Sequence, residues 1–421
     1  MTRSPWWWVP SLYFGQGLPY VVVMTVSVVM FKNLGISNTD IALATSWLYL
    51  PWVIKPLWSP LVDLLQRKRW WIVTLQAVIG AALASTVLVL PLPGFFQASL
   101  ALLWLMAFAS ATHDIAADGF YMLALPQHQQ AAFVGVRSLF YRASMIAGQG
   151  ALVMLAGRLM AVSGDPVRAW QVVMALLAGM FVLLLLWHRS VLPRPPQDHR
   201  SGDGRTLWGD FTATFASFFR RHDIGLVLGF LLTFRLGEAQ LVKLVTPFML
   251  DPASAGGLGL STEQVGLLYG TVGVASLTAG GLLGGWVVSL HGLRRWLWPM
   301  VAAIHLPNLL FVALAVWQPA SVGLVGAAVA CEQFGYGFGF AAYLLYMILV
   351  ADGPTKTAHY ALCTGFMALG MMLPGMVSGW LQQTLGYPMF FGWVCVATLP
   401  SVWLAAKLGI PPQFGRKETT A

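Results

Sequence analysis

Residues 170–192 read WQVVMALLAGMFVLLLLWHRSVL, and no charged side chain interrupts the stretch from Trp170 to Trp187. A helix rises about 1.5 Å per residue, so a run of about 20 apolar residues matches the hydrocarbon core of a bilayer. The whole chain is 58% hydrophobic and 9% charged, whereas an average soluble domain is about 25% charged. Backbone groups inside lipid are satisfied only in helices or closed barrels, and the alternation typical of strands is absent. The sequence therefore predicts an all-α integral membrane protein.

Eleven further segments resemble this one in length and apolarity. We expect twelve transmembrane helices near residues 8–31, 41–62, 70–91, 97–123, 133–157, 170–192, 224–249, 263–290, 296–317, 320–350, 358–383 and 387–407.

One extended polar stretch, residues 193–222, divides these segments into six before and six after. Its Pro, Gly and charged residues are typical of a linker, and its later part, near 207–221, is expected to lie along the membrane surface. The predicted organisation is a six-helix bundle over residues 1–192, a cytoplasmic linker over 193–222 and a second six-helix bundle over 223–421.

Basic residues are unevenly distributed between the loops. If both termini are cytoplasmic, 16 of the 24 Lys and Arg residues lie on the cytoplasmic side, 3 on the opposite side and 5 inside helices. Cytoplasmic loops of membrane proteins are enriched in Lys and Arg. We therefore expect a multi-pass protein with both termini in the cytoplasm, and the net charge of +9 requires no nucleic-acid partner.

Ionisable residues inside the apolar segments are the candidates for function, because a charge at the bilayer centre costs about 2.5–3.5 kcal/mol on insertion scales. They are Lys55, Asp114, Asp118, Arg137, Arg142, Arg235, Glu238, Lys243 and Glu332.

Asp114 and Asp118 are four residues apart, which places both carboxylates on one helical face. Like charges at this spacing repel unless a cation lies between them or one of them binds a proton. Lys55 and Arg142 are cations of the same half of the chain. Two interpretations are open: a structural charge network, or a carboxylate that exchanges a proton during transport.

Arg235 and Glu238 are three residues apart, close enough to pair on one helical face, and Lys243 follows five residues later. Glu332 stands alone in the tenth segment, among glycines that allow close helix approach or a local break. Glu332 is either a protonation switch or the partner of Arg235 or Lys243 in a permanent salt bridge.

Asp63 ends the second segment just before the basic residues Arg67 and Arg69. We expect these three residues to form a gating or structural latch at cytoplasmic helix ends. Tyr121 and Tyr336 are expected either to pack in the core or to stack on a ring-shaped ligand. The three cysteines show neither metal-ligand nor disulfide spacing, and His113 and His305 are expected to be packed and hydrogen-bonded.

Several of these stretches resemble AmpG-type permeases of the major facilitator superfamily, and the similarity runs over nearly the whole chain. The matching stretches are Lys55-Pro-Leu-Trp-Ser-Pro-Leu-Val-Asp63, Ser110-Ala-Thr-His-Asp-Ile-Ala-Ala-Asp118, Tyr141-Arg142, Arg235-Leu-Gly-Glu238 and Cys331-Glu-Gln-Phe-Gly. The resemblance implies an importer in the bacterial cytoplasmic (inner) membrane, driven by the proton-motive force. The namesake carries anhydromuropeptides, disaccharide-peptides released from peptidoglycan, into the cytoplasm for recycling. Related permeases carry siderophores such as pyochelin, and a eukaryotic branch carries acetyl-CoA.

The sequence and the resemblance together predict a monomeric proton symporter in which two six-helix bundles rock around a central site. We expect no cofactor and no metal. The proton-coupling candidates are Asp114, Asp118, Glu238 and Glu332, and the substrate-binding candidates are Gln16, Lys55, Tyr121, Arg142, Arg235, Tyr336 and Lys243. The alternatives are a siderophore permease with a more aromatic cavity, a membrane enzyme, and a non-transporting receptor or scaffold with a soluble output domain.

Overall fold

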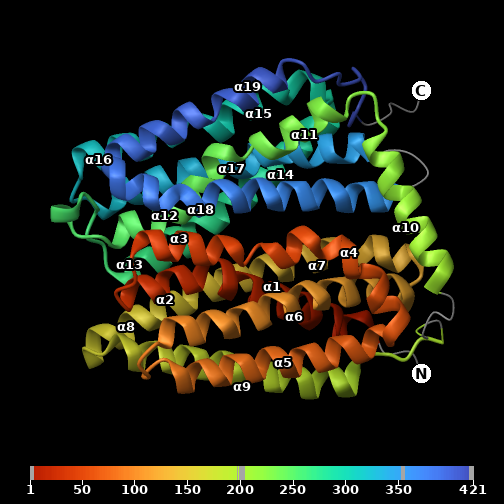
Figure 1. The fold of residues 1–421 in the computed structure, drawn as a ribbon, viewed down its shortest axis with the longest axis horizontal. Coiled ribbons are helices and arrows are strands. Elements are labelled where there is room, and N and C mark those ends of the chain that lie inside the picture. Colours follow the sequence, from red (N-terminus) through yellow and green to blue (C-terminus); the bar gives the residue numbers. More distant parts are fainter. Residues whose placement is uncertain (1–3, 197, 199–203, 352–355, 417–421) are drawn as a thin grey trace. The chain divides into compact units, whose positions relative to one another are not determined.

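The computed structural model describes residues 4–196, 198, 204–351 and 356–416. Inside helices, some side chains are not described, namely those of residues 60, 61, 63, 64, 127, 128, 130–132, 134, 204–208, 210, 211, 214 and 356–358. Every regular element in the described part is a helix (Figure 1). The helices form two compact units, and unit 1 comprises Met1–Ile36 and Ile54–Asp210. Unit 2 comprises Ser37–Val53 and Phe211–Ala421.

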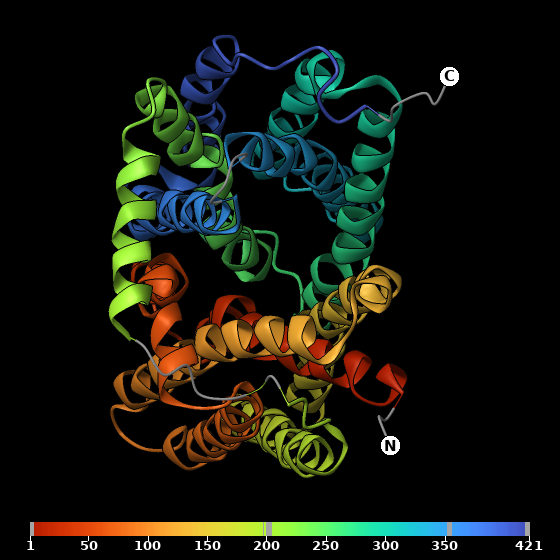
Figure 2. The same cartoon turned by 90° about the vertical axis from the view of Figure 1, so that its right-hand side faces the viewer.

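Unit 1 is built mainly from α1 (Val9–Val21), α2 (Ser27–Asn33), α4 (Leu50–Leu65), α5 (Lys68–Val89), α6 (Phe95–Ala124), α7 (Gln127–Met145), α8 (Val153–Ser163) and α9 (Pro166–Val191). Helix α5 packs against α6 and α9, and α1 packs against α7. Both views show α5 beside α9 (Figures 1 and 2).

The connection between α8 and α9 shows how local sequence sets these helix ends. Gly164 adopts the left-handed conformation (φ 67°) that commonly ends a helix. The Asp165 side chain accepts a hydrogen bond from the backbone N–H of Arg168 at 3.1 Å, and Pro166 occupies the first position of α9. A capping Asp followed by Pro is a favourable helix start, because Pro lacks the N–H that would go unbonded there.

Unit 2 contains α3 (Asn38–Trp47), α11 (Ile224–Thr233), α12 (Leu236–Leu250), α13 (Thr262–Val265), α14 (Val274–His291), α15 (Leu293–His305), α16 (Asn308–Trp317), α17 (Val322–Val350), α18 (Lys356–Ala397) and α19 (Leu399–Ala405). Helix α10 (Gly204–Phe219) occupies the later part of the polar stretch that precedes α11. Helix α17 packs against α14 and α15.

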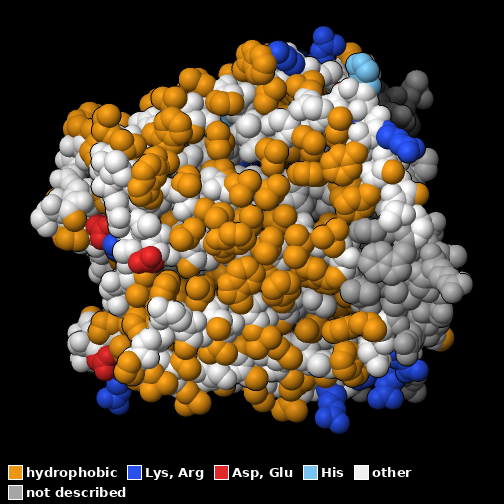
Figure 3. Space-filling view, in the orientation of Figure 1, with side chains coloured by type: hydrophobic (Ala, Val, Ile, Leu, Met, Phe, Trp, Pro, Cys, Tyr) orange, Lys and Arg blue, Asp and Glu red, His pale blue; other side chains and the backbone are white. Residues whose placement is uncertain are grey.

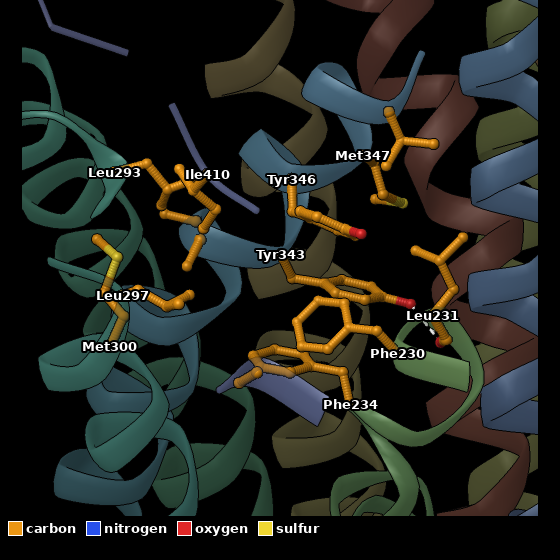
Figure 4. Close-up of a cluster of buried hydrophobic side chains, with 14 of the residues drawn as sticks. Phe230, Leu231, Phe234, Leu293, Leu297, Met300, Tyr343, Tyr346, Met347 and Ile410 are labelled. Carbon is orange, nitrogen blue, oxygen red and sulfur yellow. Dashed lines mark hydrogen bonds between the residues drawn. The ribbon is translucent and has the colours of Figure 1, made fainter. Parts of the chain in front are cut away.

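One core cluster of unit 2 combines aliphatic side chains with packed aromatic rings (Figure 4). The rings of Phe234 and Tyr343 are stacked with their centroids 4.9 Å apart, and Phe230 lies against both Tyr343 and Tyr346. The Tyr343 hydroxyl donates a hydrogen bond to the carbonyl of Leu231 at 2.6 Å. The buried phenol thus satisfies a carbonyl at the end of α11 while its ring remains in the apolar core.

Ten helices of the described chain are long and apolar enough to cross a membrane. The all-α membrane prediction is confirmed, but the count of twelve crossings is not fully confirmed. The predicted second segment is divided into α3 and α4 by a turn at residues 48–49. The predicted eleventh and twelfth segments form one 47-residue span, His359–Ala405, within which Gly386 (φ 72°) breaks the helical conformation.

Hydrophobic side chains cover most of the face seen in Figure 3. The Lys, Arg, Asp and Glu side chains visible on that face lie toward the helix ends (Figure 3). This distribution suits helices that present apolar side chains to lipid and charges to the membrane boundary.

Candidate functional site

Asp118 lies at the centre of a polar cluster in unit 1. The Arg137 guanidinium of α7 approaches Asp118 Oδ1 at 2.9 Å, and the Tyr13 hydroxyl of α1 donates a hydrogen bond to the same oxygen at 3.1 Å. The guanidinium also lies 4.5 Å from the ring centroid of Tyr13 and 5.3 Å from that of Tyr121. Asp118 therefore has a cation that two aromatic faces hold in place.

Asp114 has a different cation. Lys55 Nζ of α4 lies 3.5 Å from Asp114 Oδ2, and the Asp114 side chain is 17% exposed. The two carboxylates that share a face of α6 thus bind separate cations, which offsets their mutual repulsion.

The other candidates of unit 1 lie on α1 and α7. Tyr141 is within electrostatic reach of Asp114, Asp118 and Arg142, and Arg142 is half-buried. Gln16 is buried, and its side-chain oxygen has no hydrogen-bond partner among the described residues.

Sequence reasoning missed Tyr13 and the pairing of Arg137 with Asp118. Arg137 belonged to the set of intramembrane charges, but its partner could not be deduced because no spacing along one helix relates α7 to α6. Tyr13 carried no sequence signal that separates it from the other aromatic residues.

Arg235 has a central place in the polar cluster of unit 2. It precedes α12 with a non-helical backbone (φ −105°, ψ 17°), and its guanidinium donates a hydrogen bond to the Tyr336 hydroxyl of α17. The guanidinium also lies 5.2 Å from the ring centroid of Tyr336 and 5.0 Å from that of Phe340. Arg235 and Tyr336, both predicted as candidates, are therefore brought together.

Glu238 and Glu332 are two buried carboxyl groups with few hydrogen-bond partners among the described residues. They are 2% and 1% exposed. Neither oxygen of Glu238 has a hydrogen-bond partner in the described structure, and Glu332 Oε1 has none either. Glu332 Oε2 accepts a hydrogen bond from the Gln333 amide at 2.9 Å. Glu238 acts electrostatically on Glu332, and Arg235 acts on Glu238, so two carboxyl groups face one nearby cation.

The pairings that the sequence left open in this half are not formed among the described residues. Arg235 and Glu238 form no hydrogen bond, and no ion pair joins Glu332 to Arg235 or Lys243 within the described residues. The spacing of three residues brings side chains onto one face only in a continuous helix. Here the chain bends at Arg235, before α12 begins, and the guanidinium turns toward α17.

Lys243 is a buried cation that donates a hydrogen bond to a neutral hydroxyl group. It is 2% exposed, and its Nζ donates a hydrogen bond to Thr45 Oγ1 at 2.9 Å. Nζ also lies 5.1 Å from the ring centroid of Tyr49. No carboxylate lies within 4.0 Å of Nζ among the described residues. Such a cation is suited to bind an anionic group.

The side chains of only two of the three expected latch residues, Arg67 and Arg69, lie within the described part of the structure. Asp63 lies near the end of α4, and its side chain falls outside the described residues. Arg67 is exposed at the N-terminus of α5. Arg69 donates hydrogen bonds to the carbonyls of Arg189 and Leu192, so it fastens the start of α5 to the end of α9.

Two buried histidines of unit 1 belong to one hydrogen-bonded chain. Gln76 contacts His113 Nε2 at 3.2 Å and His188 Nδ1 at 2.8 Å, and Ser11 Oγ contacts His188 Nε2 at 2.9 Å. In unit 2, His305 contacts Ser401 at 2.9 Å. These contacts agree with the expectation that His113 and His305 are packed and hydrogen-bonded.

Ionisable and aromatic side chains clustered inside long apolar helices are typical of one class of protein, the polytopic membrane transporters. The family model of the Major Facilitator Superfamily matches residues 11–352, and the chain belongs to that superfamily. It is a multi-pass membrane transporter and not an enzyme.

Two curated relatives match most of the chain. The anhydromuropeptide permease of Escherichia coli (strain K12) is 25% identical over 411 residues, which cover 93% of this chain and 77% of the relative. The putative transporter AmpG 4 of Rickettsia conorii is 25% identical over 405 residues, 92% of each chain.

Solved structures show the same fold. A D-xylose-proton symporter aligns with a TM-score of 0.70 at 13% identity and covers 97% of both chains. The nucleoside transporter NupG aligns with a TM-score of 0.67 at 17% identity, over 94% of this chain and 98% of that one.

Proposed function

We propose that this transporter is a proton-coupled importer of a cell-wall-derived anhydromuropeptide, or a similar sugar-peptide, across the bacterial inner membrane. Two six-helix bundles, residues 1–192 and 223–421, would alternate access to a central site, with both termini in the cytoplasm. The name of the Escherichia coli relative supports the substrate. The observation that carries the coupling is the buried pair Glu238 and Glu332, whose oxygens largely lack hydrogen-bond partners among the described residues.

In this proposal, one proton resides on the Glu238–Glu332 pair while the site faces the outer side. A single nearby cation, Arg235, offsets one negative charge, so the second carboxyl group is better accommodated as the neutral acid. Loss of that proton toward the cytoplasm leaves two carboxylates beside one cation, and their repulsion changes the preferred arrangement of α12 and α17. Asp114 and Asp118 remain candidates, but each already has a cation at 3.5 Å or less.

The substrate would be recognised through its anionic and ring-shaped groups. The peptide of an anhydromuropeptide carries carboxylates, which Lys243 and Arg235 in unit 2, or Lys55 and Arg142 in unit 1, would bind. Tyr121 and Tyr336 would stack on sugar faces. The unpartnered oxygen of Gln16 would accept a hydrogen bond from a sugar hydroxyl. The names of the relatives favour this substrate class over the siderophore alternative.

The test is uptake of radiolabelled anhydromuropeptide into proteoliposomes whose outside is made acidic. Glu238→Gln and Glu332→Gln are expected to abolish accumulation driven by the gradient, while exchange of substrate at equal pH continues. Glu263→Gln, on α13 near the start of a different span, serves as the matched control.

Full accumulation by both glutamine variants would show that the proton is carried elsewhere. Accumulation of an iron chelate, with no uptake of the anhydromuropeptide, would instead overturn the substrate assignment.

A further inference from the structure

A basic cavity lies in unit 1 where α5 begins and α9 ends. Its volume is about 850 Å³, and four arginines line it, namely Arg67, Arg69, Arg189 and Arg194. A second hollow of about 810 Å³ shares Arg69, Arg189 and Arg194. Arg69, Arg189 and Arg194 therefore give both hollows a cationic lining. In Figure 3, Lys and Arg side chains gather near the ends of α5 and α9 labelled in Figure 1.

The positive charge of this cavity is only partly balanced within the described structure, since one carboxylate, Asp198, lies among four arginines. None of the four arginines forms an ion pair among the described residues. Asp198 is the one acidic side chain in the lining, and its two oxygens accept the backbone N–H groups of Lys68 at 2.8 Å and Arg69 at 3.1 Å. This carboxylate caps α5, so it is largely committed to the helix start.

The arginines also repel one another. Arg69 experiences the like charges of Arg194 and Arg189, which the opposite charge of Asp198 offsets in part. The positive end of the α5 dipole adds to the same potential. An anion placed in the cavity would relieve this repulsion.

Apart from Gln66 and Thr74, the remaining lining of the cavity is apolar, and part of it follows the membrane-spanning helices. It includes Trp70 and Val73 of α5 with Leu185 and Leu186 of α9, and both helices are long and apolar enough to cross a membrane. Trp70 is 45% exposed and Leu186 57% exposed. The cavity thus joins a cationic end to an apolar side that lipid can reach, and tryptophan is typical of the membrane interface.

We propose that this cavity binds the phosphate headgroup of an anionic phospholipid, whose acyl chains lie along α5 and α9. Guanidinium groups match phosphate oxygens in bidentate geometry, and basic pockets at the cytoplasmic ends of transmembrane helices recognise anionic headgroups. A free phosphate would use the arginines alone and leave the apolar wall without a role. The site is separate from the Glu238–Glu332 pair, so this inference does not depend on the proposed substrate.

The test is native mass spectrometry of the full chain in detergent, titrated with phosphatidylglycerol. The double variant Arg189→Gln/Arg194→Gln is expected to weaken binding about 10- to 30-fold, because each surface arginine contributes modestly to anionic lipid affinity. Arg69 is kept, since it holds α9 against α5. The matched control is Arg294→Gln/Arg295→Gln, which removes the same charge from exposed positions at the start of α15.

Three other results would overturn the proposal. The cavity variant could bind phosphatidylglycerol as the wild type does, phosphatidylcholine could bind equally well, or millimolar inorganic phosphate could displace the lipid. Leu186→Asp provides a second probe, because it places a charge on the apolar wall and leaves every arginine in place. It should lower lipid binding with no change in helical content by circular dichroism, and unchanged binding would contradict the acyl-chain placement.

Discussion

At the scale of single residues, the intramembrane carboxyl groups are of two kinds. Asp114 and Asp118 each have a cation at 3.5 Å or less, whereas Glu238 and Glu332 have no ion pair among the described residues. We interpret the first kind as a network that holds helices together and the second as the place where a proton can be exchanged. In this interpretation, the presence or absence of an ion pair, rather than burial alone, distinguishes a structural carboxylate from a proton-exchanging one.

The pair formed by Asp118 and Arg137 makes a testable contribution to stability. Asp118→Asn is expected to lower the free energy of unfolding by about 1 kcal/mol or less, because both side chains are about one-third exposed and water screens them. The measurement is the thermal unfolding midpoint in detergent. The double variant Asp118→Asn/Arg137→Gln should lose less than the sum of the two single variants, and strictly additive losses would show that the contact contributes nothing.

Helical periodicity predicted part of this site and missed the rest for identifiable reasons. The shared face of Asp114 and Asp118 follows from their spacing, since four residues complete about one turn of a helix. The partner of Asp118 depends on how α7 packs against α6, which spacing along one chain does not determine. The spacing of Arg235 and Glu238 allows a contact only in a continuous helix, and this contact does not form because the chain bends at Arg235.

At the scale of elements, glycines decide how closely α17 packs. A Cβ on Gly335 would overlap the carbonyl of Ala303 in α15, and a Cβ on Gly339 would lie 2.6 Å from the Cβ of Ile304. The sequence allowed either close helix approach or a local break at these glycines. The structure shows close approach, and α17 runs unbroken from Val322 to Val350.

Substituting one of these glycines should separate the two helices. Gly339→Ala is expected to lower the free energy of unfolding by about 1–3 kcal/mol, because the added carbon overpacks the contact with α15. Gly285→Ala on α14 is the control, since nothing lies within 4 Å of its added Cβ, and it should be neutral or stabilising. Equal unfolding midpoints for the two variants would contradict this account of the contact.

Proline explains the break that the sequence reading passed over. The sequence predicts one helix over residues 41–62, but α4 begins at Leu50 with Pro51 in its first turn. Pro has no N–H to donate, so it is well accommodated in the first turn of a helix and disfavoured in the middle of one. Residues 48–49 accordingly form a turn between α3 and α4.

At the scale of the whole molecule, apolar length and composition predicted the superfamily fold well. Ten helices of the described chain are long and apolar enough to cross a membrane. One difference from twelve arises because the turn at residues 48–49 divides the predicted segment 41–62 into two shorter helices. The other arises because the last two predicted segments form one span, His359–Ala405, across the break at Gly386. Membrane orientation stays a prediction, which rests on 16 of the 24 basic residues falling on one side.

Orientation can be measured by labelling single cysteines in cells. In a variant with Cys331, Cys363 and Cys395 replaced by Ser, Ser254→Cys is expected to react with a membrane-impermeant maleimide from outside. Gln413→Cys should react only after the membrane is permeabilised, because the charge bias places the two exposed positions on opposite sides. Labelling of Gln413→Cys in intact cells would reverse the predicted orientation.

The hydrogen bonds from Lys68 and Arg69 to Asp198 also bear on the connection between the two halves of the chain. Because Asp198 is fastened to the start of α5, the spacer to the following helices effectively starts after residue 198 rather than after Leu192. A shorter tether raises the effective concentration of the segments it joins. Through these two hydrogen bonds, the Asp198 carboxylate shortens the part of the linker that can separate the two halves of the chain.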